Sequence, residues 1–432
     1  MVDFTRIPFH MPGHKRNTEL FAAESGVTLP YELDITEIDG ADDLHDMCGD
    51  LAELSSLAAR LYGARSAFPM VNGSTGGILA AIATVSDGGD TIIMSREAHK
   101  SAYNAVEMCG LTPVYLDEVT PAAVADALDL HLNCACVFVT SPTYLGSVAD
   151  IEGLAHVAHA KNIPLVVDAA HGAHLGFSKA FPRNASRLGA DIEIVSLHKT
   201  LPSLTQTALA LVSGDLVVAK ELELRLRVFE TSSPSYVLLA SIERCLHLLE
   251  SQGAALFAQY EARLHLFYER TRLTPAGDIG KIVIPAESGG GRRLMQRFRE
   301  EFNIELEMCG VDYALAMTSI ADTDAAFDAL AAAVIATKTT VHCNSLTPKY
   351  HVPERHCTPI EARRQTGEVV LYREAVGRVT REYAWAYPPG VPLLVPGEVI
   401  DLQVVAQLDA LKAAGIEPHS DYGELPGVSV VE

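Results

Sequence analysis

The sequence predicts an α/β protein with a mostly parallel sheet and a second, smaller domain. From about residue 66 to 215, short apolar runs alternate with helix-like segments, a pattern typical of parallel βαβ units. Four runs have the length and composition of buried strands, at residues 91–94, 136–139, 165–167 and 192–195. The segments at 75–86 and 151–161 have the length and composition of helices. Together these observations favour a doubly wound α/β domain.

The rest of the chain predicts a long helix followed by a smaller α+β domain. Residues 216–252 are rich in Leu, Glu and Arg and are expected to form one helical stretch between two domains. Beyond it we expect strands at 281–284 and 313–317, helices at 292–302 and 325–336, and a turn at the glycine run 289–291. The expected parts are an N-terminal arm contributing to the active site (1–62), a large cofactor-binding domain (63–255) and a C-terminal α+β domain (256–432).

Polar or small residues follow each of the four predicted strands directly. The four clusters lie at residues 95–99, 140–143, 168–171 and 196–199. Because ligands of open α/β sheets bind at the carboxyl ends of the strands, we expect the clusters to converge on a single site.

The net charge and the length of the apolar runs limit the kinds of partner that the protein can bind. The chain has 33 Lys+Arg against 55 Asp+Glu, a formal net charge of −22. This balance argues against nucleic acid or an anionic membrane surface as a partner, since both require clustered cations. It favours a small neutral or cationic ligand. The N-terminus lacks the pattern of a secretory signal, and the apolar runs are shorter than the ~20 residues that span a bilayer.

The eight cysteines are scattered and form no CxxC pair, which predicts reduced thiols and a cytoplasmic protein. Two cysteines and three histidines gather between residues 342 and 357. Structural zinc sites have tighter and more regular spacings, so we interpret this segment as a proline-containing connection and expect no metal.

The segment Asn72-Gly73-Ser74-Thr75-Gly76 precedes an apolar helix pattern. Small residues at a helix N-terminus expose free backbone N–H groups at the positive end of the helix dipole, which suits a phosphate group. An ordinary Ser/Thr N-cap is the alternative. The lysine of a nucleotide P-loop is absent, so ATP is not expected.

Asp168 and Lys199 each follow a predicted strand. A carboxylate in that place would bind a metal with His171 and His174, activate a base, or pair with a cationic ring nitrogen. A lysine is ordinarily a solvated surface cation, but one desolvated beside a ligand site has a lowered pKa and is a competent Schiff-base amine. A phosphate seat, a carboxylate, a lysine and a histidine (His99) able to stack on a ring together fit pyridoxal phosphate (PLP).

The chain resembles the ornithine/lysine/arginine decarboxylases of the fold-type-I PLP superfamily over nearly its whole length. The segments that carry the resemblance are 8–15 (PFHMPGHK), 39–45 (DGADDLH), 72–75 (NGST), 99–101 (HKS), 141–146 (SPTYLG), 168–172 (DAAHG), 196–202 (SLHKTLP), 231–236 (TSSPSY), 387–392 (YPPGVP) and 396–398 (PGE). The SxHK and YPPGxP segments are fairly specific to this family. The resemblance implies a fold-type-I large domain with a smaller α+β C-terminal domain.

The resemblance also implies roles for single residues. Lys199 would hold the cofactor aldehyde, Asp168 would pair with the pyridinium nitrogen, and His99 and Ala170 would lie against the two ring faces. The phosphate and the rest of the cofactor would be held by Ser74, Thr75, Gly76, His171, Ser196 and His198. Catalysis would fall to Lys199, His99, Asp168 and His198. Glu398 and His14 would contact the substrate, with Glu398 near its distal cation.

The chain departs from the family pattern at three places. Asn17 stands where the family usually has Gly, Glu97-Ala98 replaces a commoner Asn-Cys-like pair, and Leu211 stands where many members have His. None removes an expected catalytic group, but each leaves the choice of substrate open. The chain begins almost at the first motif, so we expect no receiver-like domain like that of the long members.

The expected activity is PLP-dependent decarboxylation of arginine, lysine or ornithine, with a preference for arginine by analogy with short family members that act in polyamine synthesis. Another PLP reaction such as transamination, a non-catalytic regulator related to the decarboxylases, and a metal hydrolase remain as alternatives. The resemblance implies a homodimer with shared active sites.

Overall fold

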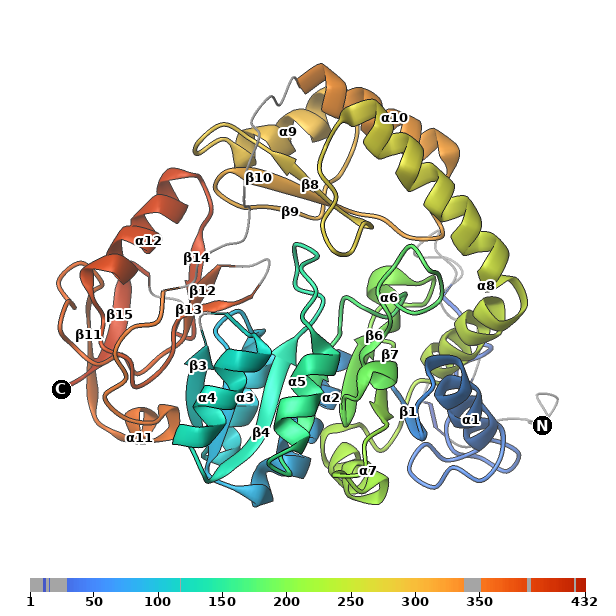
Figure 1. Cartoon of the computed structure of the whole chain (residues 1–432), viewed down its shortest axis with the longest axis horizontal. Helices are drawn as coiled ribbons and strands as arrows, with labels where there is room; N and C mark the ends of the chain where they lie inside the picture. The colour runs from blue at the N-terminus through green and yellow to red at the C-terminus, as the bar shows by residue number, and fades with distance from the viewer. Residues whose placement is uncertain are drawn as a thin grey trace.

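The structure is a computed structural model that describes residues 11–12, 15, 29–116, 118–337, 351–386, 390–422 and 425–432. Its centre is a seven-stranded sheet with the order β1-β7-β6-β5-β4-β2-β3 (Figure 1). The strands are β1 (Ser66–Met70), β2 (Thr91–Ser95), β3 (Thr112–Leu116), β4 (Cys134–Thr140), β5 (Leu165–Asp168), β6 (Ile192–Ser196) and β7 (Ala208–Val212). Strands β3, β2, β4, β5 and β6 run parallel, whereas β7 is antiparallel to both of its neighbours. The predicted mostly parallel sheet and its four predicted strands are confirmed.

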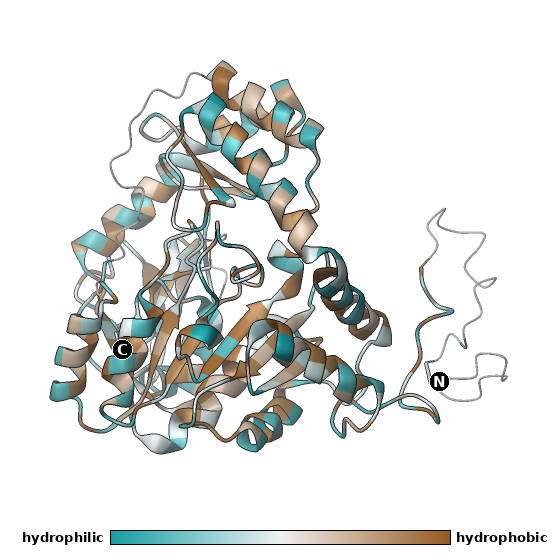
Figure 2. Cartoon of the chain, turned by 45° about the vertical axis from the view of Figure 1, so that its right-hand side comes forward, coloured by the Kyte–Doolittle hydropathy of each residue, from teal (hydrophilic) through white to brown (hydrophobic). Residues whose placement is uncertain are grey.

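Helices cover both faces of this sheet. The helices of the large domain are α1 (Asp50–Tyr62), α2 (Gly73–Val85), α3 (Lys100–Cys109), α4 (Pro121–Leu130), α5 (Ile151–His159), α6 (Leu197–Thr200) and α7 (Ala219–Phe229), with short 3-10 turns η2 (Ser86–Gly88) and η3 (Ala185–Leu188). Successive strand residues alternate between two cores: Val137 and Val139 pack with α1, α4 and α5, whereas Phe138 packs with α2, α3 and α7. Burial on both faces explains why these strands read as continuous apolar runs (Figure 2).

The predicted single helix over 216–252 is wrong, because the chain forms two helices there. Helix α7 ends at Phe229 and α8 (Tyr236–Thr271) begins six residues after Glu230, with Ser235 as its N-cap. Pro234 lacks an N–H and restricts the residue before it, so a helix cannot run through this point. Glu230 turns inward, and its carboxylate accepts the N–H of Val71 at 3.3 Å.

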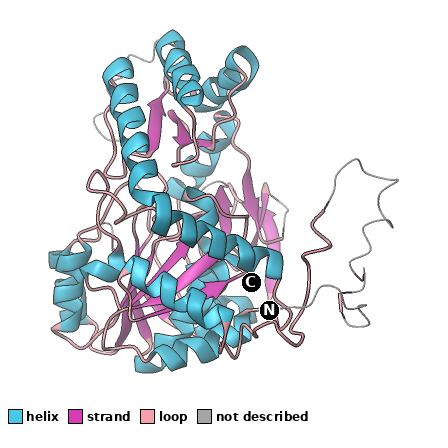
Figure 3. Cartoon of the chain, turned by 90° about the vertical axis from the view of Figure 1, so that its right-hand side faces the viewer, coloured by secondary structure: helices cyan, strands magenta, loops and turns pink. Residues whose placement is uncertain are grey.

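Helix α8 connects the large domain to a small antiparallel sheet. It packs against α1 at one end and against α10 (Asp324–Thr337) at the other (Figures 1 and 3). The small sheet has the order β8-β10-β9, and α9 lies beside it. Its elements are β8 (Lys281–Pro285), α9 (Gly291–Phe302), β9 (Met308–Cys309) and β10 (Tyr313–Met317). The strands and helices predicted for this region are confirmed, and so is the turn before α9, where Gly289 has a φ of 70°.

The last part of the chain forms a further unit beside the large domain. It contains α11 (Pro359–Arg364), β11 (Gly367–Leu371), β12 (Ala384–Ala386), β13 (Pro392–Leu394), α12 (Leu402–Ala413), β14 (Pro418–Ser420) and β15 (Gly427–Val431). Its sheets are β11-β15 and β13-β12-β14. The boundary expected at residue 255 therefore lies inside α8, and the segment beyond α8 folds as two units with separate sheets. None of the helices in the described ranges is long and apolar enough to cross a membrane.

Helix α2 lies unusually close to the sheet at Gly77. A Cβ at this position would lie 2.7 Å from Met70 Cε and 3.0 Å from Ile194 Cγ2, so an added methyl group requires these two buried side chains or the helix to shift. The residues at the start of α2 face the carboxyl edge of the sheet, so this close contact fixes their position.

We expect Gly77→Ala to lower the free energy of unfolding by about 1–3 kcal/mol, because the added methyl group overpacks the contact with the sheet. Gly253→Ala in α8 is the matched control. The nearest atom to a Cβ there is Leu249 Cβ at 3.9 Å, so the change should stabilise the helix by about 0.5–1 kcal/mol. Denaturant unfolding of both variants measures the difference, and an unchanged Gly77→Ala protein would contradict the expectation.

Candidate active site

A cavity of about 300 Å³ lies at the carboxyl edge of the large sheet, where the sequence predicts a convergent site. Residues that follow β2, β4, β5 and β6 line it, together with the start of α2 and the turn before β7. The lining residues are Asn72, Gly73, Ser74, Thr75, Ile78, Glu97, His99, Thr140, Tyr144, Asp168, Ala170, His171, His198, Lys199, Thr205, Gln206 and Val391. All four predicted clusters contribute, so the predicted convergence is confirmed.

The N-terminus of α2 opens into this cavity without a side-chain cap. The side chain of Asn72 donates to the carbonyl of Phe229 at 2.8 Å and leaves the helix N–H groups free. Gly73 has a φ of 70°, and its N–H donates to the Gln206 carbonyl at 2.9 Å. Ser74 and Thr75 therefore present uncapped N–H groups to the cavity, an arrangement that suits an anion. Gly76 lies behind them, facing Asn72 rather than the cavity.

Asp168 is the last residue of β5, and Lys199 lies in α6, which directly follows the neighbouring parallel strand β6. Burial lowers the pKa of Lys199, although Asp168 and Glu307 act in the opposite direction. Burial raises the pKa of Asp168, against the effects of Lys199 and of the Ala170 N–H, which donates to the carboxylate at 3.0 Å. A lowered pKa increases the neutral, nucleophilic fraction of the Lys199 amine at physiological pH.

Two histidines in the cavity have their ring orientation fixed by the backbone. His99 caps α3, with its Nδ1 accepting the N–H of Ser101 at 3.2 Å. Burial and the nearby Lys199 and Lys100 lower the pKa of His99 to about 4, so the ring is neutral at physiological pH. His198 donates from Nδ1 to the Thr207 carbonyl at 3.0 Å, and burial lowers its pKa as well. Both rings are therefore neutral and preoriented.

His171 lies between two lysines. Its Nε2 lies 3.2 Å from Lys199 Nζ, and its Nδ1 lies 2.7 Å from Nζ of Lys281, the first residue of β8. A protonated Lys281 donates to Nδ1 and so directs the His171 proton to Nε2, toward Lys199. Lys281 is only 2% exposed, and within the described ranges no carboxylate lies within ion-pair distance of it. Burial lowers its pKa to about 8, although Asp278 opposes this shift.

The sequence gives no local signal for Lys281, because a lysine at the start of a strand usually faces solvent. Its burial results from the contact between the small sheet and His171, more than a hundred residues earlier in the chain. Glu97, Thr140, Thr205, Gln206 and Val391 were likewise not predicted as site residues, although Glu97 stands out in the sequence as a departure from the family pattern.

Removing the buried charge of Lys281 should change how stability depends on pH. The folded pKa of about 8 lies below the unfolded value of about 10.4, so between these values the unfolded chain binds more protons and stability rises with pH. Burying the ammonium costs on the order of 3 kcal/mol below pH 8, and the cost disappears by about pH 10. We expect wild type to gain thermal stability relative to Lys281→Met across this window.

The unfolding temperatures of both proteins at pH 7 and pH 10 test this expectation. Lys161→Met removes an exposed lysine that pairs with Asp129 and serves as the control, for which the difference from wild type should not change with pH. If the difference in unfolding temperature between wild type and Lys281→Met is the same at pH 7 and pH 10, as expected for the control, Lys281 carries no buried charge.

Three sequence-predicted site residues do not line the cavity. Ser196 is fully buried at the end of β6, and its Oγ has no hydrogen-bond partner in the described part of the chain. Glu398 is 1% exposed, with its carboxylate 3.0 Å from the Arg96 guanidinium and accepting the Val395 N–H at 2.8 Å. Gly76 is described above. His14 lies outside the described residues, as do Asn17 and residues 387–389 of the C-terminal motif.

The Arg96–Glu398 ion pair joins the C-terminal unit to the end of β2. The guanidinium lies over the ring of Tyr115, 5.0 Å from its centroid, and that of Tyr103, at 5.6 Å. Burial raises the pKa of Glu398, against the effect of Arg96. In this chain the Glu398 carboxylate is paired with Arg96 and does not line the cavity.

Glu398→Gln would leave the Arg96 guanidinium buried without its counter-charge, and we expect a loss of about 3–5 kcal/mol in the free energy of unfolding. Asp215→Asn removes the partner of Arg65 from an exposed ion pair and should cost little. Denaturant unfolding compares the two variants. A Glu398→Gln protein as stable as the control would contradict a structural role for this pair.

The other two departures from the family pattern are structural. Ala98, in the loop after β2, and Leu211, in β7, are both fully buried, each in one of the two cores that flank the sheet. Neither side chain lines the cavity.

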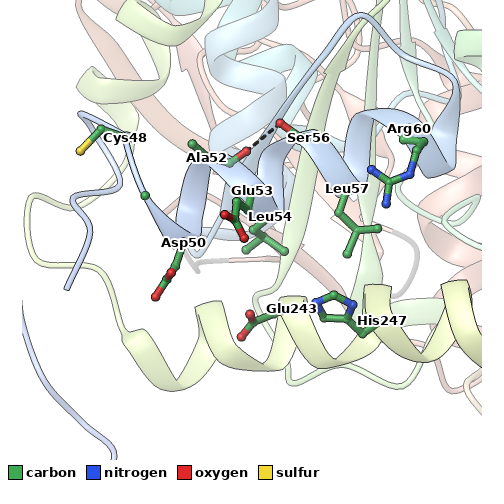
Figure 4. A pocket seen from close by; sticks show the side chains of 11 residues that line it. Cys48, Asp50, Ala52, Glu53, Leu54, Ser56, Leu57, Arg60, Glu243 and His247 are labelled. Atoms are coloured by element: carbon green, nitrogen blue, oxygen red, sulfur yellow. Dashed lines mark hydrogen bonds between the residues drawn. The ribbon is translucent and has the colours of Figure 1, made fainter. Parts of the chain in front are cut away.

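A larger hollow of about 500 Å³ lies between α1 and α8 (Figure 4). Asp50, Glu53, Glu243 and His247 line it, but Arg60 at its edge is paired with Glu250 at 2.6 Å. None of the predicted site residues belongs to it, so the smaller cavity is the one that carries chemistry.

No group of described residues has the composition of a metal site. Two residues of the alternative hydrolase have other partners, since His171 contacts the two lysines and His174 contacts Asp278 at 3.1 Å. In the histidine- and cysteine-rich segment, His351 contacts Asp401 at 2.5 Å, and His342 and Cys343 lie outside the described residues.

One cavity thus brings together a strand-end lysine with a lowered pKa, a buried carboxylate, a neutral imidazole ring and an uncapped helix N-terminus. These features define the class of site found in PLP-dependent enzymes of this fold. Two family models match the chain: Orn/Lys/Arg decarboxylase, major domain, over residues 1–260, and Orn/Lys/Arg decarboxylase, C-terminal domain, over residues 338–419. The chain belongs to the Orn/Lys/Arg decarboxylase family.

Relatives and solved structures agree with this assignment. The chain is 30% identical to the arginine decarboxylase of Halalkalibacterium halodurans, over 95% of this chain and 91% of that protein. It is 28% identical to the arginine decarboxylase of Bacillus subtilis, over the same shares. The constitutive lysine decarboxylase of E. coli superposes with a TM-score of 0.79 at 19% identity, covering 99% of this chain and 79% of that one. A serine palmitoyltransferase from S. paucimobilis with bound PLP superposes with a TM-score of 0.55 at 14% identity, covering 67% and 76%. The fold-type-I architecture expected from the resemblance is confirmed.

Proposed function

We propose that this protein is a PLP-dependent decarboxylase of a basic L-amino acid, with arginine as the preferred substrate. The observation that carries the proposal is the position of Lys199, a buried amine of lowered pKa between Asp168, His171 and the uncapped start of α2. Membership of the Orn/Lys/Arg decarboxylase family supports the reaction class. Two relatives named arginine decarboxylase, at 30% and 28% identity, support the preference for arginine.

The residues around the cavity fit PLP. The start of α2 offers N–H groups with no side-chain cap, as a phosphate requires. The Oγ of Ser196, behind the cavity lining, is buried and has no partner among the described residues, so it has hydrogen-bonding capacity left for a ligand that reaches it. The buried Asp168 carboxylate faces the cavity, and a cationic ring nitrogen would compensate its charge.

When bound, PLP supplies an electron sink for the electron pair released as CO2 leaves the substrate. Lys199 provides the amine that holds the cofactor aldehyde. Asp168 stabilises a proton on the ring nitrogen, and the neutral ring of His99 offers a flat face for stacking. His171, with its Nδ1 bonded to Lys281, would keep a proton on Nε2, 3.2 Å from Lys199 Nζ, and could supply that proton in general acid catalysis.

The expected homodimer with shared active sites has support in an adjoining groove. A hollow of about 1070 Å³ is lined by Leu33, Ile35, Pro202, Leu204 and Tyr236, among others, and Leu204 and Leu33 are 49% and 57% exposed. Leu204 directly precedes Thr205 and Gln206 of the cavity, so a second copy seated there would lie beside the active site. The seven cysteines that the structure describes are free, which supports the expected reducing, cytoplasmic location.

Purified protein supplied with PLP should release CO2 and form the corresponding amine from one or more of arginine, lysine and ornithine, fastest with arginine. Lys199→Ala should lose both turnover and the visible absorption of covalently held cofactor, because no other lysine lines the cavity among the described residues. Lys179→Ala, in an exposed position, is the control and should retain both. A 2-oxo acid product would favour an aminotransferase, and a colourless wild-type protein would favour a non-catalytic regulator.

A further inference from the structure

We propose that Glu97 is the binding site for the distal cationic group of the substrate, the role that the family resemblance gives to Glu398. The inference rests on the proposed function and adds the residue that selects the substrate class. It is carried by the placement of Glu97 in the cavity and by the lack of an ion pair between its carboxylate and any cation in the described part of the chain.

The side chains of the loop after β2 point in two directions. Arg96 and Ala98 are buried in the body of the protein, at 2% and 0% exposure, whereas Glu97 and His99 are half-buried and line the cavity. The N–H of Glu97 donates to Ser95 Oγ at 3.1 Å, which holds the loop in this conformation. The carboxylate of Glu97 is therefore directed into the same space as the ring of His99.

Among the described residues, two carboxylates line the cavity, Glu97 and Asp168. Asp168 lies next to Lys199 and accepts the Ala170 N–H, and the proposed function pairs it with the ring nitrogen of the cofactor. Glu97 alone remains to bind a charge on the substrate.

The cations that lie near Glu97 in the sequence have other partners. Arg96 is paired with Glu398 at 3.0 Å, and Lys100 is paired with Asp421 at 2.6 Å. Across the described ranges, no Lys or Arg lies within ion-pair distance of the Glu97 carboxylate. Glu97 is thus a largely desolvated carboxyl group that lacks a counter-charge from this part of the chain.

Electrostatics agree with this placement. Burial alone raises the pKa of Glu97 to about 7. The titratable groups that face this end of the cavity are Tyr313 from β10, His99, which is neutral, and Lys199 at the strand end beyond. A cation bound at Glu97 would lower its pKa again, so the binding of a cationic ligand near pH 7 should release a proton.

The ligand class follows from charge and shape. A guanidinium or an ammonium at the end of an aliphatic chain would supply the missing charge, and a guanidinium would bind a carboxylate through two parallel hydrogen bonds. An uncharged side chain of the same length would leave the Glu97 anion desolvated and unpaired, and an acidic side chain would repel it. The site therefore selects amino acids with a distal cation.

Glu97→Gln keeps the shape of the side chain and removes its charge. We expect KM for the cationic substrate to rise about 10- to 100-fold with little change in kcat, because a charge-assisted contact at a remote part of the substrate is lost. The preference for arginine over its uncharged analogue citrulline should fall by the same factor. Glu152→Gln, on an exposed position of α5, changes the net charge equally and should leave KM unchanged.

Calorimetry of agmatine binding provides a readout without turnover. In buffers of different ionisation enthalpy near pH 7, wild type should release about half a proton more per bound amine than Glu97→Gln does, because a Glu97 with a pKa of about 7 is half protonated there. Glu97→Asp should bind with intermediate affinity and still release a proton, which separates loss of charge from loss of fold.

The outcomes separate the inference from the proposed function. A wild-type enzyme that releases CO2, with a Glu97→Gln variant that keeps its KM and its proton release, would overturn the subsite and leave the decarboxylase intact. A fall in kcat at unchanged KM would overturn it too, since Glu97 would then act at the reacting carbon. A wild type that releases no CO2 contradicts the function, while the calorimetric comparison still decides the subsite.

Discussion

The burial of unbalanced charge at the carboxyl edge of the sheet is the constraint on which the rest of the site depends. Lys199, Asp168, Lys281 and Glu97 are all largely withdrawn from bulk water there, and none forms an ion pair with another described side chain, although Lys199 and Asp168 attract each other. Each would be unfavourable in isolation, because desolvating a charge without compensation costs several kcal/mol. Uncompensated buried charges of this kind are typical of functional sites, where a bound cofactor and substrate supply the opposite charges.

The parts of the chain outside the large domain hold this edge in place. The small sheet supplies Lys281, which sets the tautomer of His171. The C-terminal unit supplies Glu398, whose ion pair with Arg96 anchors the loop that carries Glu97 and His99. Glu398 lies 302 positions from Arg96 in the sequence and nevertheless holds the loop that lines the cavity. Lys281 contacts His171, which lines the cavity, and Glu398 contacts Arg96, the neighbour of the lining residue Glu97, whereas neither Lys281 nor Glu398 lines the cavity itself.

The sequence predicted the large sheet, the edge at which the site lies, and most of the residues there. These predictions succeeded because they depend on local signals: an apolar run marks each strand, and the residue that follows it must lie at the strand's end. Lys199, Asp168 and His99 were found in this way. Lys281 and the pairing of Glu398 were beyond such reasoning, because their surroundings come from segments that are distant in the chain. Pro234 is a helix-breaking residue that the sequence shows, but the helix-favouring composition of the residues on both sides predicted one continuous helix.

The net charge of −22 and the single carboxylate of Glu97 act over different ranges. Surface charge raises the local concentration of any cation, but it is screened within about 8 Å at physiological ionic strength and does not distinguish one cation from another. Discrimination requires a carboxylate that is desolvated, close to the ligand and fixed in position. The turn after β2 meets these conditions because Arg96 and Ala98 are held in the protein interior on either side of Glu97. The acidic surface therefore accounts for attraction of the substrate class, and the loop after β2 accounts for its recognition.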